Sequence, residues 1–393
     1  MTDRFRDELD QLRDAGLYRE LRPTTDGTNA WVTLEGRRVL LLCSNDYLGL
    51  AGHPALAEAA ARAAREWGVG AGASRLVSGS LRIHDELETR LASLKHTEAA
   101  LLFPSGYHAN IGAVTALVGK GDAVFSDALN HASIIDGCRL SGARVHVYAH
   151  GDTDALRSTL RGSAPARRRL VVTDSVFSMD GDRAPLAELC VVAAAHDAML
   201  MVDEAHATGV LGASGGGLVE ELGVGEQVTA QIGTLGKALG CAGAFVAGSR
   251  SLIALLVNRA RSFIYTTAMP PPTVAAALAA LDVVAAEPER RARVLARAAE
   301  LRRRLGAVGH SVPPGDTPIL PVMVGDSRRA MQWAEALLRH GVLARAIRPP
   351  TVPQGTARLR VTVMATHTAS DVEHAVDAFA ALARPARATA RND

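Results

Sequence analysis

The middle of the chain alternates between short apolar runs and segments with helical periodicity. The apolar runs predict buried strands at residues 99–103, 122–127, 144–149, 169–177, 198–205 and 243–248. Helical patterns occupy most of the intervals, at residues 106–118, 133–142, 153–162 and 186–196. Buried strands that alternate with helices indicate an α/β fold, in which helices cover both faces of a mainly parallel sheet.

The two ends of the chain have a different pattern. Residues 3–21 predict an amphipathic helix, and residues 31–42 predict two short strands around a Glu-Gly turn. Beyond about residue 285, an Arg- and Glu-rich helical pattern precedes strand and helix patterns joined by a proline-rich loop. We therefore expect an N-terminal helix with short strands (1–50), a large α/β domain (51–285) and a small α+β domain (286–393).

Composition narrows the class of protein. The 43 basic and 41 acidic residues leave a net charge of +2. This balance lacks the excess of positive charge that is expected of a protein that binds nucleic acid or an anionic membrane. The four cysteines are scattered without a Cys-x-x-Cys pair, so we expect reduced thiols and neither disulfides nor a metal site. The N-terminus is charged, and the longest apolar stretch (274–286) is too short to span a bilayer. A cytoplasmic protein is expected.

Lysine is rare in this chain, so any chemistry that needs a lysine amine has three candidates. Lys237 lies in the segment Thr-Leu-Gly-Lys-Ala-Leu-Gly, where the glycines allow the backbone to turn sharply around a ligand. A lysine amine can form a Schiff base with a carbonyl cofactor. A phosphate-binding P-loop is excluded, because Ala238 stands where that motif needs Ser or Thr. Lys95, after a helix, and Lys120, in a Gly-Lys-Gly turn, are predicted to be solvated.

Polar residues follow two of the predicted strands. Asp203 and His206 come after the apolar segment MLMV (199–202), where the acid can pair with a protonated ring nitrogen and the histidine with another edge of the same ring. The alternative is that Asp203 caps the next helix. Gly106 and Tyr107, after Ser105, begin a helix and can present free N–H groups to an anion. An ordinary helix cap is the alternative there.

Two further candidates lie elsewhere along the chain. His131 has a flat ring that can stack on a cofactor, although a lone histidine is more often a hydrogen-bonded core residue. Arg358 and Arg360 alternate on a predicted strand and therefore share one face of it. Either arginine can hold a carboxylate with two parallel hydrogen bonds, or both can lie on a solvated strand face.

Taken in order, these features resemble the fold-type I enzymes that use pyridoxal 5′-phosphate (PLP), and among them the α-oxoamine synthase family. The resemblance extends over residues 17–367, which is nearly the whole chain. The segments that carry it are SNDYLG, GAGASR, SDALNHASIIDG, VFSMDGDRAPL, VDEAHATGVLG, TLGKALG, YTTAMPP and ARLRVTVMATH.

The resemblance implies a role for each matching residue. Lys237 is expected to hold PLP covalently, Asp203 to pair with the pyridine N–H, His206 to contact the phenolic oxygen and His131 to stack on the ring. Further cofactor contacts are implied for Gly106, Tyr107, Ser178 and Thr234, with Thr266 or Thr267 supplied by the second subunit of a homodimer. Substrate contacts are implied for Arg19, Asn45, His131, Thr351 and Arg360.

The resemblance also implies a reaction, the condensation of an amino acid with an acyl thioester and loss of CO2. The segments SNDYLGL, SRLVSGS and RPPTVP (348–353) are most similar to members that join L-alanine to a pimeloyl thioester, carried by coenzyme A or acyl carrier protein, in biotin synthesis. SDALNHASIIDG is equally typical of members that join glycine to acetyl-CoA. A PLP aminotransferase is the alternative from a different class.

Overall fold

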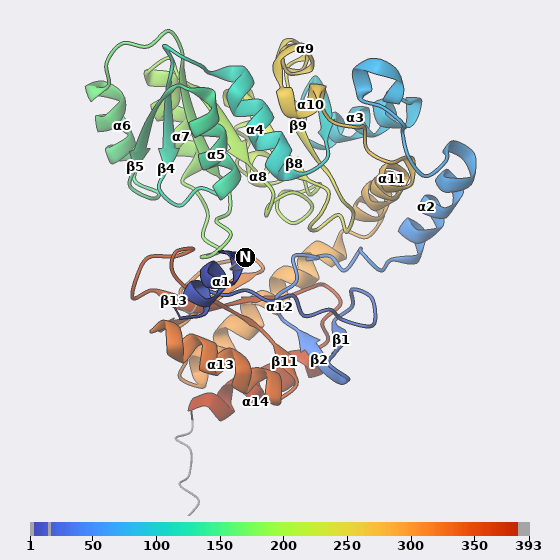
Figure 1. The fold of residues 1–393 in the computed structure, drawn as a ribbon, viewed down its shortest axis with the longest axis vertical. Helices are drawn as coiled ribbons and strands as arrows, with labels where there is room; N and C mark the ends of the chain where they lie inside the picture. Colours follow the sequence, from blue (N-terminus) through green and yellow to red (C-terminus); the bar gives the residue numbers. More distant parts are fainter. Residues whose placement is uncertain (1–3, 15–16, 384–393) are drawn as a thin grey trace, which may run out of the picture.

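A computed structural model describes residues 4–14 and 17–383 of the chain. The larger part of the molecule is built on a seven-stranded sheet with the order β3-β9-β8-β7-β6-β4-β5 (Figure 1). Its strands are β3 (Ala99–Phe103), β4 (Ala123–Asp127), β5 (Arg144–Tyr148), β6 (Arg169–Asp174), β7 (Met199–Asp203), β8 (Ala230–Thr234) and β9 (Ala244–Gly248). Strands β5, β4, β6, β7 and β8 are parallel neighbours. The predicted mainly parallel α/β fold is confirmed.

The sequence prediction missed β8 and the direction of β9. Strand β9 is antiparallel to both of its neighbours, β8 and β3. Strand β3 therefore runs in the same direction as the parallel strands. The segment Ala230–Thr234 contains Gln231 and Gly233, which break the apolar run that marks the other buried strands. Its burial is decided by its neighbours in the sheet.

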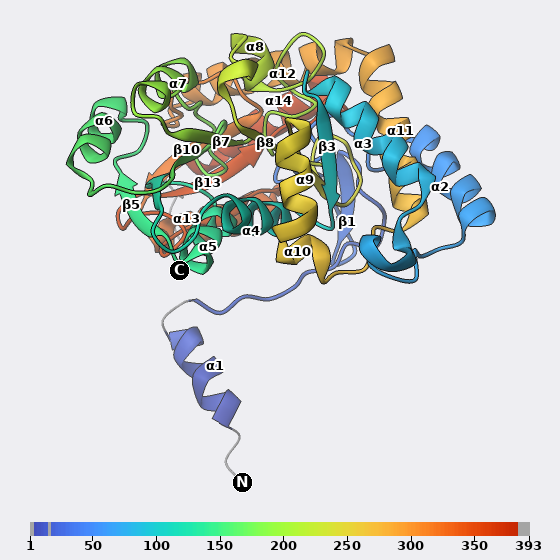
Figure 2. The same cartoon turned by 90° about the horizontal axis from the view of Figure 1, so that it is seen from above.

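Alternating side chains of each strand enter two apolar layers. In β6, Leu170 and Val172 belong to one buried cluster, and Val171 belongs to the other. Figure 2 shows helices on both sides of the sheet. The helices of this part are α3 (Arg82–Leu94), α4 (Gly106–Leu117), α5 (Ala132–Ser141), α6 (Thr153–Gly162), α7 (Leu186–Ala195), α8 (Leu218–Leu222), α9 (Arg250–Arg259) and α10 (Arg261–Ile264).

The smaller part lies below the large sheet in Figure 1. It holds two three-stranded sheets, with the orders β10-β13-β12 and β1-β2-β11. Their strands are β1 (Trp31–Leu34), β2 (Arg37–Leu41), β10 (Ile319–Gly325), β11 (Val342–Leu343), β12 (Arg345–Ile347) and β13 (Ala357–Thr362). Its helices are α12 (Glu289–Ala307), α13 (Ser327–Arg339) and α14 (Ala369–Ala383). Since β2 pairs with β11, the N-terminal strands complete the C-terminal part of the fold.

Three further α-helices of the described residues lie outside these two groups. Helices α2 (Pro54–Trp67) and α11 (Pro271–Ala286) pack against each other beside α3. Helix α1 (Arg4–Asp14) projects from the body of the molecule (Figure 2). The prediction of one helix over residues 3–21 was wrong beyond Asp14, because residues 17–21 are non-helical, while residues 3, 15 and 16 lie outside the described part. No helix in the described ranges is long and apolar enough to cross a membrane.

Candidate active site

The carboxyl ends of the parallel strands bring the predicted site residues to one edge of the large sheet. Strand β6 ends at Asp174, β7 at Asp203 and β8 at Thr234. His131 follows the end of β4 by four residues and caps the N-terminus of α5. Ligands bind in the crevice outside the carboxyl ends of such strands. The topology alone therefore marks this edge as the candidate site.

Lys237 lies in the turn between β8 and β9, beside a buried histidine. Its Nζ atom is 3.1 Å from Nε2 of His206, whose Nδ1 is 2.7 Å from the hydroxyl of Tyr47. Burial lowers the pKa of Lys237 below its ordinary value. Burial, with the nearby Lys237 charge, also holds the pKa of His206 well below its usual range. A neutral amine is the form that acts as a nucleophile or a base.

The turn that carries Lys237 depends on a glycine. Gly240 has a φ of +65°, and a Cβ atom there would lie 2.4 Å from the backbone nitrogen of Ala51. Glycine permits both the left-handed backbone and this close approach. The turn that carries Lys237 therefore packs against the backbone of Leu50 and Ala51. These residues follow closely after Asn45 and Tyr47, which also belong to the candidate site.

Asp203 is joined to His131 by two polar side chains. One carboxylate oxygen of Asp203 accepts a 2.6 Å hydrogen bond from Asn110 Nδ2, and the other accepts a 2.8 Å bond from the Ala205 N–H. Asn110 also donates to Ser133 Oγ, which lies 2.7 Å from His131 Nδ1. The sequence motifs do not single out Asn110. Its only signal is a polar residue between Ala109 and Ile111, four residues after Gly106.

Arg360 is buried on β13 and points into the same region. Its side chain is 7% exposed and donates to Asn45 Oδ1 at 3.0 Å and to the backbone oxygen of Ser178. It also reaches the Tyr47 hydroxyl at 3.5 Å. Arg358, 4% exposed, pairs with Asp180. The alternative of a solvated strand face is therefore wrong for both arginines.

Tyr47 is the second residue that the sequence analysis missed. Its hydroxyl links the His206 ring to Asn45 Oδ1, at 3.3 Å, and to Arg360. It lies in the SNDYLG segment, where only Asn45 had an expected role. Hydrogen bonds therefore connect Lys237, His206, Tyr47, Asn45 and Arg360 in one continuous chain.

A cavity of about 690 Å³ opens beside His131. Its wall combines the loops after β4 and β6 with the proline-rich loop of the smaller part, so both parts of the molecule form it. The apolar lining includes Leu129, Ile135, Phe177 and Val352. The polar lining includes Asp174, His131, Ser178, Thr351 and Arg358. A cavity of this size and lining is suited to an organic substrate with an apolar chain.

A neighbouring cavity of about 550 Å³ receives Arg19. Thr351 lines both cavities, so the two predicted substrate residues Arg19 and Thr351 share a wall. Arg22, Arg345 and Arg348 also line this second cavity. It is therefore rich in arginine.

We call the hydrogen-bonded residues Lys237, His206, Tyr47, Asn45 and Arg360 the Lys237 cluster. The other predicted residues lie outside it. Gly106 and Tyr107 form the first turn of α4, where Ser105 caps the helix and Tyr107 donates to Asp136. Thr234 Oγ1 accepts a bond from the Gly236 N–H below the lysine turn. Thr266 and Thr267 line a small separate cavity with Arg75 and Met269. Among the described residues, no hydrogen bond joins either threonine to the Lys237 cluster.

The prediction that Lys95 is solvated was wrong. Its side chain is fully buried, with Nζ 2.7 Å from Glu204 Oε2 and 2.9 Å from Thr208 Oγ1. A buried ammonium is tolerated when a carboxylate and further acceptors surround it. Lys120 is exposed, as predicted. Of the three lysines, Lys237 is thus the one whose amine faces a neutral imidazole at the strand ends.

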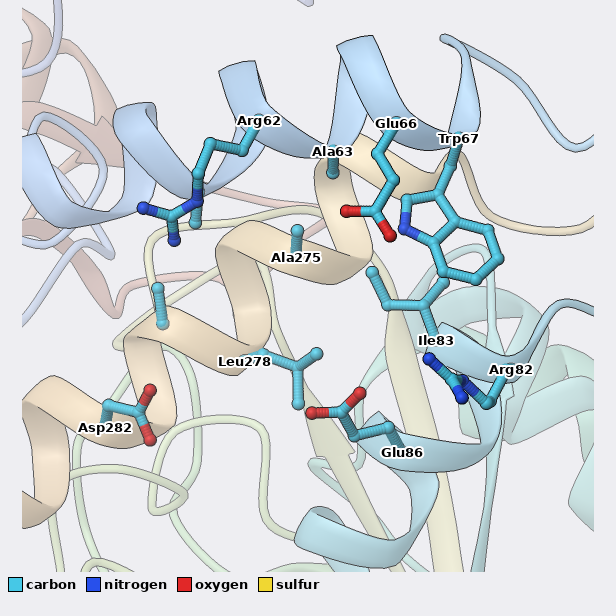
Figure 3. Close-up of a pocket in the computed structure, with 12 residues that line it drawn as sticks. Arg62, Ala63, Glu66, Trp67, Arg82, Ile83, Glu86, Ala275, Leu278 and Asp282 are labelled. Carbon is cyan, nitrogen blue, oxygen red and sulfur yellow. The ribbon is translucent and has the colours of Figure 1, made fainter.

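A further groove of about 280 Å³ lies between α2, α3 and α11 (Figure 3). Apolar side chains such as Leu278 and Ile83 form its floor, and charged residues such as Arg62 and Glu86 surround it. None of the predicted site residues lines this groove. The candidate chemistry is concentrated at the sheet edge.

The carboxyl edge of the sheet thus holds a lysine amine, a buried carboxylate and an imidazole. Known proteins with a similar sequence and fold show which class of protein this is. The family model for aminotransferase class I and II matches residues 37–379. A solved structure of serine palmitoyltransferase (SPT) with its PLP internal aldimine superposes on this structure with a TM-score of 0.91 at 32% identity, over 97% of this chain and 96% of that chain.

The curated relatives narrow the class. The 8-amino-7-oxononanoate synthase of Geobacter sulfurreducens is 53% identical over 387 residues, covering 98% of this chain and 99% of the relative. The solved 8-amino-7-oxononanoate synthase of Francisella tularensis has a TM-score of 0.75 at 26% identity, over 87% of this chain and 97% of that chain. This chain belongs to the aminotransferase class I and II family and, within it, to the α-oxoamine synthases, as its motifs predict.

Proposed function

We propose that the protein is a PLP-dependent acyltransferase that condenses L-alanine with a pimeloyl thioester. The products are 8-amino-7-oxononanoate, CO2 and a free thiol, in biotin biosynthesis. The observation that carries this function is the near full-length similarity to 8-amino-7-oxononanoate synthases. The cluster of Lys237, His206, Asp203 and Arg360 at the sheet edge supplies the side chains that this chemistry needs.

The residues at the sheet edge fit PLP. The Lys237 amine has a lowered pKa, which suits covalent attachment of a carbonyl compound. Asp203 offers a buried carboxylate for a protonated ring nitrogen. Gly106 leaves open space where a Cβ atom would stand at the N-terminus of α4, a position that favours a phosphate group. We expect Gly106, Tyr107 and Thr234 to hold that phosphate, and Ser178 to contact the cofactor.

When bound, PLP supplies an electron-accepting ring that stabilises the charge left at the substrate Cα. We expect the Lys237 Nζ atom to remove the α-proton, a general-base role that contributes roughly 10²–10⁴-fold to rate. The Asp203 carboxylate would keep the ring nitrogen protonated, and the buried His206 imidazole would hydrogen-bond to the phenolic oxygen. His131, at the N-terminus of α5, would cover one face of the ring and exclude water from it.

The substrates are expected to enter from the side of His131. Arg360, with Asn45 beside it, is placed to hold the amino-acid carboxylate by charge-assisted hydrogen bonds. The apolar cavity next to His131 is large enough for an acyl chain. Arg19 and Thr351 extend the binding region toward the arginine-rich second cavity, which suits the anionic part of a thioester carrier.

A homodimer with shared active sites is part of this proposal. The loop that contains Thr266 and Thr267 is bonded to the glycine-rich segment through Ala268 N–H and Ala73 O, at 3.0 Å. These two segments leave large apolar side chains exposed, namely Val69, Leu76, Val77 and Tyr265. A second copy covering this surface would bring a threonine to the partner's phosphate site. We also expect a cytoplasmic location, consistent with four free cysteines.

A thiol-release assay tests the function. L-alanine, glycine and L-serine are each combined with pimeloyl and acetyl thioesters of coenzyme A, and with pimeloyl-acyl carrier protein. Alanine with a pimeloyl thioester should give the highest kcat/KM, and the carrier that gives the higher value is the physiological type. Highest turnover with glycine and acetyl-CoA, or keto-acid formation without thiol, would contradict the proposal.

Mixed dimers test the shared site. Lys237→Ala and the double variant Thr266→Ala/Thr267→Ala should each be inactive alone. Subunit exchange between them should restore activity, because one of the two sites in a mixed dimer then has an intact lysine and intact threonines. Exchange that is demonstrated by mass spectrometry without recovered activity would contradict a shared site.

A further inference from the structure

Two carboxyl groups lie side by side at the edge of the large sheet. Asp174 and Asp203 end the neighbouring parallel strands β6 and β7 and are paired in register. Both are buried, at 3% and 4% exposure. Because side chains at the same register of adjacent strands lie on the same face, the two carboxyl groups compete to carry a negative charge.

The two carboxyl groups differ in their hydrogen-bond partners. Its two oxygens accept bonds from Asn110 Nδ2 and the Ala205 N–H. Asp174 accepts at Oδ2 from the His131 N–H, at 2.8 Å. Burial, and then the Asp203 charge, raise the pKa of Asp174 well above its ordinary value, although that N–H and Lys237 act in the opposite direction. Asp127, on β4, adds to the increase.

Asp174 also faces the cavity beside His131. It lines this space together with Asn130, His131 and Ser178, whereas Asp203 is not among the lining residues. The pair thus has one carboxyl group directed to the cofactor region and one at the wall of the cavity in which we place the acyl chain. Neither the motifs nor the resemblance gives Asp174 a role.

We propose that Asp174 is a catalytic residue that remains a neutral carboxylic acid and donates a hydrogen bond to the carbonyl oxygen of the acyl thioester. This inference rests on the proposed function. When a carbanion attacks that carbonyl carbon, a C–C bond forms and the C=O π electrons move to oxygen. The Asp174 O–H stabilises this oxyanion, which re-forms the carbonyl as the C–S bond breaks and the thiolate leaves. Asp174 keeps its proton throughout.

Two variants separate hydrogen-bond donation from placement of His131. Asp174→Asn retains an oxygen to accept from the His131 N–H and gains an amide N–H donor. Asp174→Ala removes the donor and the acceptor. Asp152→Asn is the matched control, because it makes the same chemical change at the exposed N-cap of α6. Asparagine and aspartate are similar in that position.

Thiol release and α-proton exchange should respond differently. Asp174→Ala should lower the rate of thiol release by about 10²–10³-fold, as expected when one oxyanion donor is removed. Asp174→Asn should recover most of that loss. Exchange of the alanine α-proton in D2O, measured without thioester, should equal that of the wild type in both variants. An equal loss in Asn and Ala, or a parallel loss of exchange, would overturn the proposal.

An infrared measurement gives a readout independent of turnover. In cofactor-free protein labelled with [¹³C]aspartate, the wild type at pH 7 should show the C=O band of a protonated carboxyl group. That band should lose intensity in Asp174→Asn and keep its full intensity in Asp152→Asn. A fully ionised Asp174 would overturn the inference even if the Ala variant failed to fold. If instead the wild type releases no thiol from any pimeloyl thioester, the proposed function fails, and the infrared result still reports on Asp174.

Discussion

The Nζ atom of Lys237 lies 3.1 Å from Nε2 of His206, and the other nitrogen of that imidazole lies 2.7 Å from the Tyr47 hydroxyl. The lysine amine therefore faces a buried ring whose pKa, like its own, is lowered by burial. In both groups, burial shifts the protonation equilibrium toward the neutral form. The arrangement keeps a reactive amine available at the sheet edge, in a chain with three lysines.

Covalent attachment of the cofactor should be confined to Lys237. Reduction of the PLP-loaded protein with borohydride, followed by peptide mapping, should place the label on the peptide that contains Lys237. Lys95 is unreactive because its ammonium is buried in an ion pair with Glu204. Label on a peptide with Lys95 or Lys120 would rule out the assignment. Lys237→Ala should lose the label and all turnover.

Asp203→Asn should leave the cofactor bound but slow α-proton exchange. The amide can still accept from the Ala205 N–H, but it carries no charge to keep a ring nitrogen protonated. We expect a decrease of at least about 10²-fold, within the range of lost acid–base catalysis. Deuterium exchange into L-alanine, followed by NMR, measures it. Near-normal exchange would contradict the role of Asp203.

Arg360→Lys should weaken binding of the amino acid. Lysine keeps the positive charge but loses the planar fork that contacts Asn45 and Ser178. The KM for L-alanine should rise about tenfold or more, equivalent to about 1.4 kcal/mol, whereas the KM for the thioester should change little. An unchanged KM for alanine would show that Arg360 does not bind the carboxylate.

Lys95→Met should destabilise the protein strongly. The substitution leaves the Glu204 carboxylate buried without its cation, and breaking such a pair costs about 3–5 kcal/mol. The double variant Lys95→Met/Glu204→Gln should recover much of this loss. Urea unfolding at constant cofactor concentration measures it. Lys120→Met, at an exposed position, is the control and should change stability by less than about 0.5 kcal/mol.

His150 should make stability depend on pH in the alkaline range. Its two ring nitrogens lie 2.9 Å from Asp127 and 2.8 Å from Asp182, which raises its pKa to about 10. A histidine whose pKa is raised on folding contributes its full stabilisation below the unfolded pKa of about 6.5. That contribution is lost as the pH rises through the folded pKa of about 10.

The variant His150→Gln isolates this effect. The wild type should exceed it in the free energy of unfolding by about 1.5–3 kcal/mol at pH 6, the range for hydrogen bonds to charged groups. The difference should disappear above pH 10, where the imidazole is neutral in both states. A difference that does not vary with pH would show that packing against Phe177, and no ion pair, accounts for the effect of His150.

The sequence predicted much of the fold because local patterns carry it. The strands at Ala99–Phe103 and Met199–Asp203 and the helix at Thr153–Gly162 follow directly from apolar runs and helical periodicity. Strand β8 was missed because it contains the polar residue Gln231. Neighbouring strands bury Gln231, and its amide donates a hydrogen bond to the Lys95 carbonyl oxygen. No pattern within five residues contains that information.

By itself, the sequence determined the family and the mainly parallel sheet, and it singled out Lys237 as the candidate for the reactive amine, because these depend on motifs and local periodicity. Only the tertiary structure decided that Lys95 is buried, that Tyr47 joins His206 to Arg360, and that Asp174 stands beside Asp203. These contacts join residues far apart in the chain, such as Tyr47 and Arg360. They are set by strand register and by packing between the two parts of the molecule.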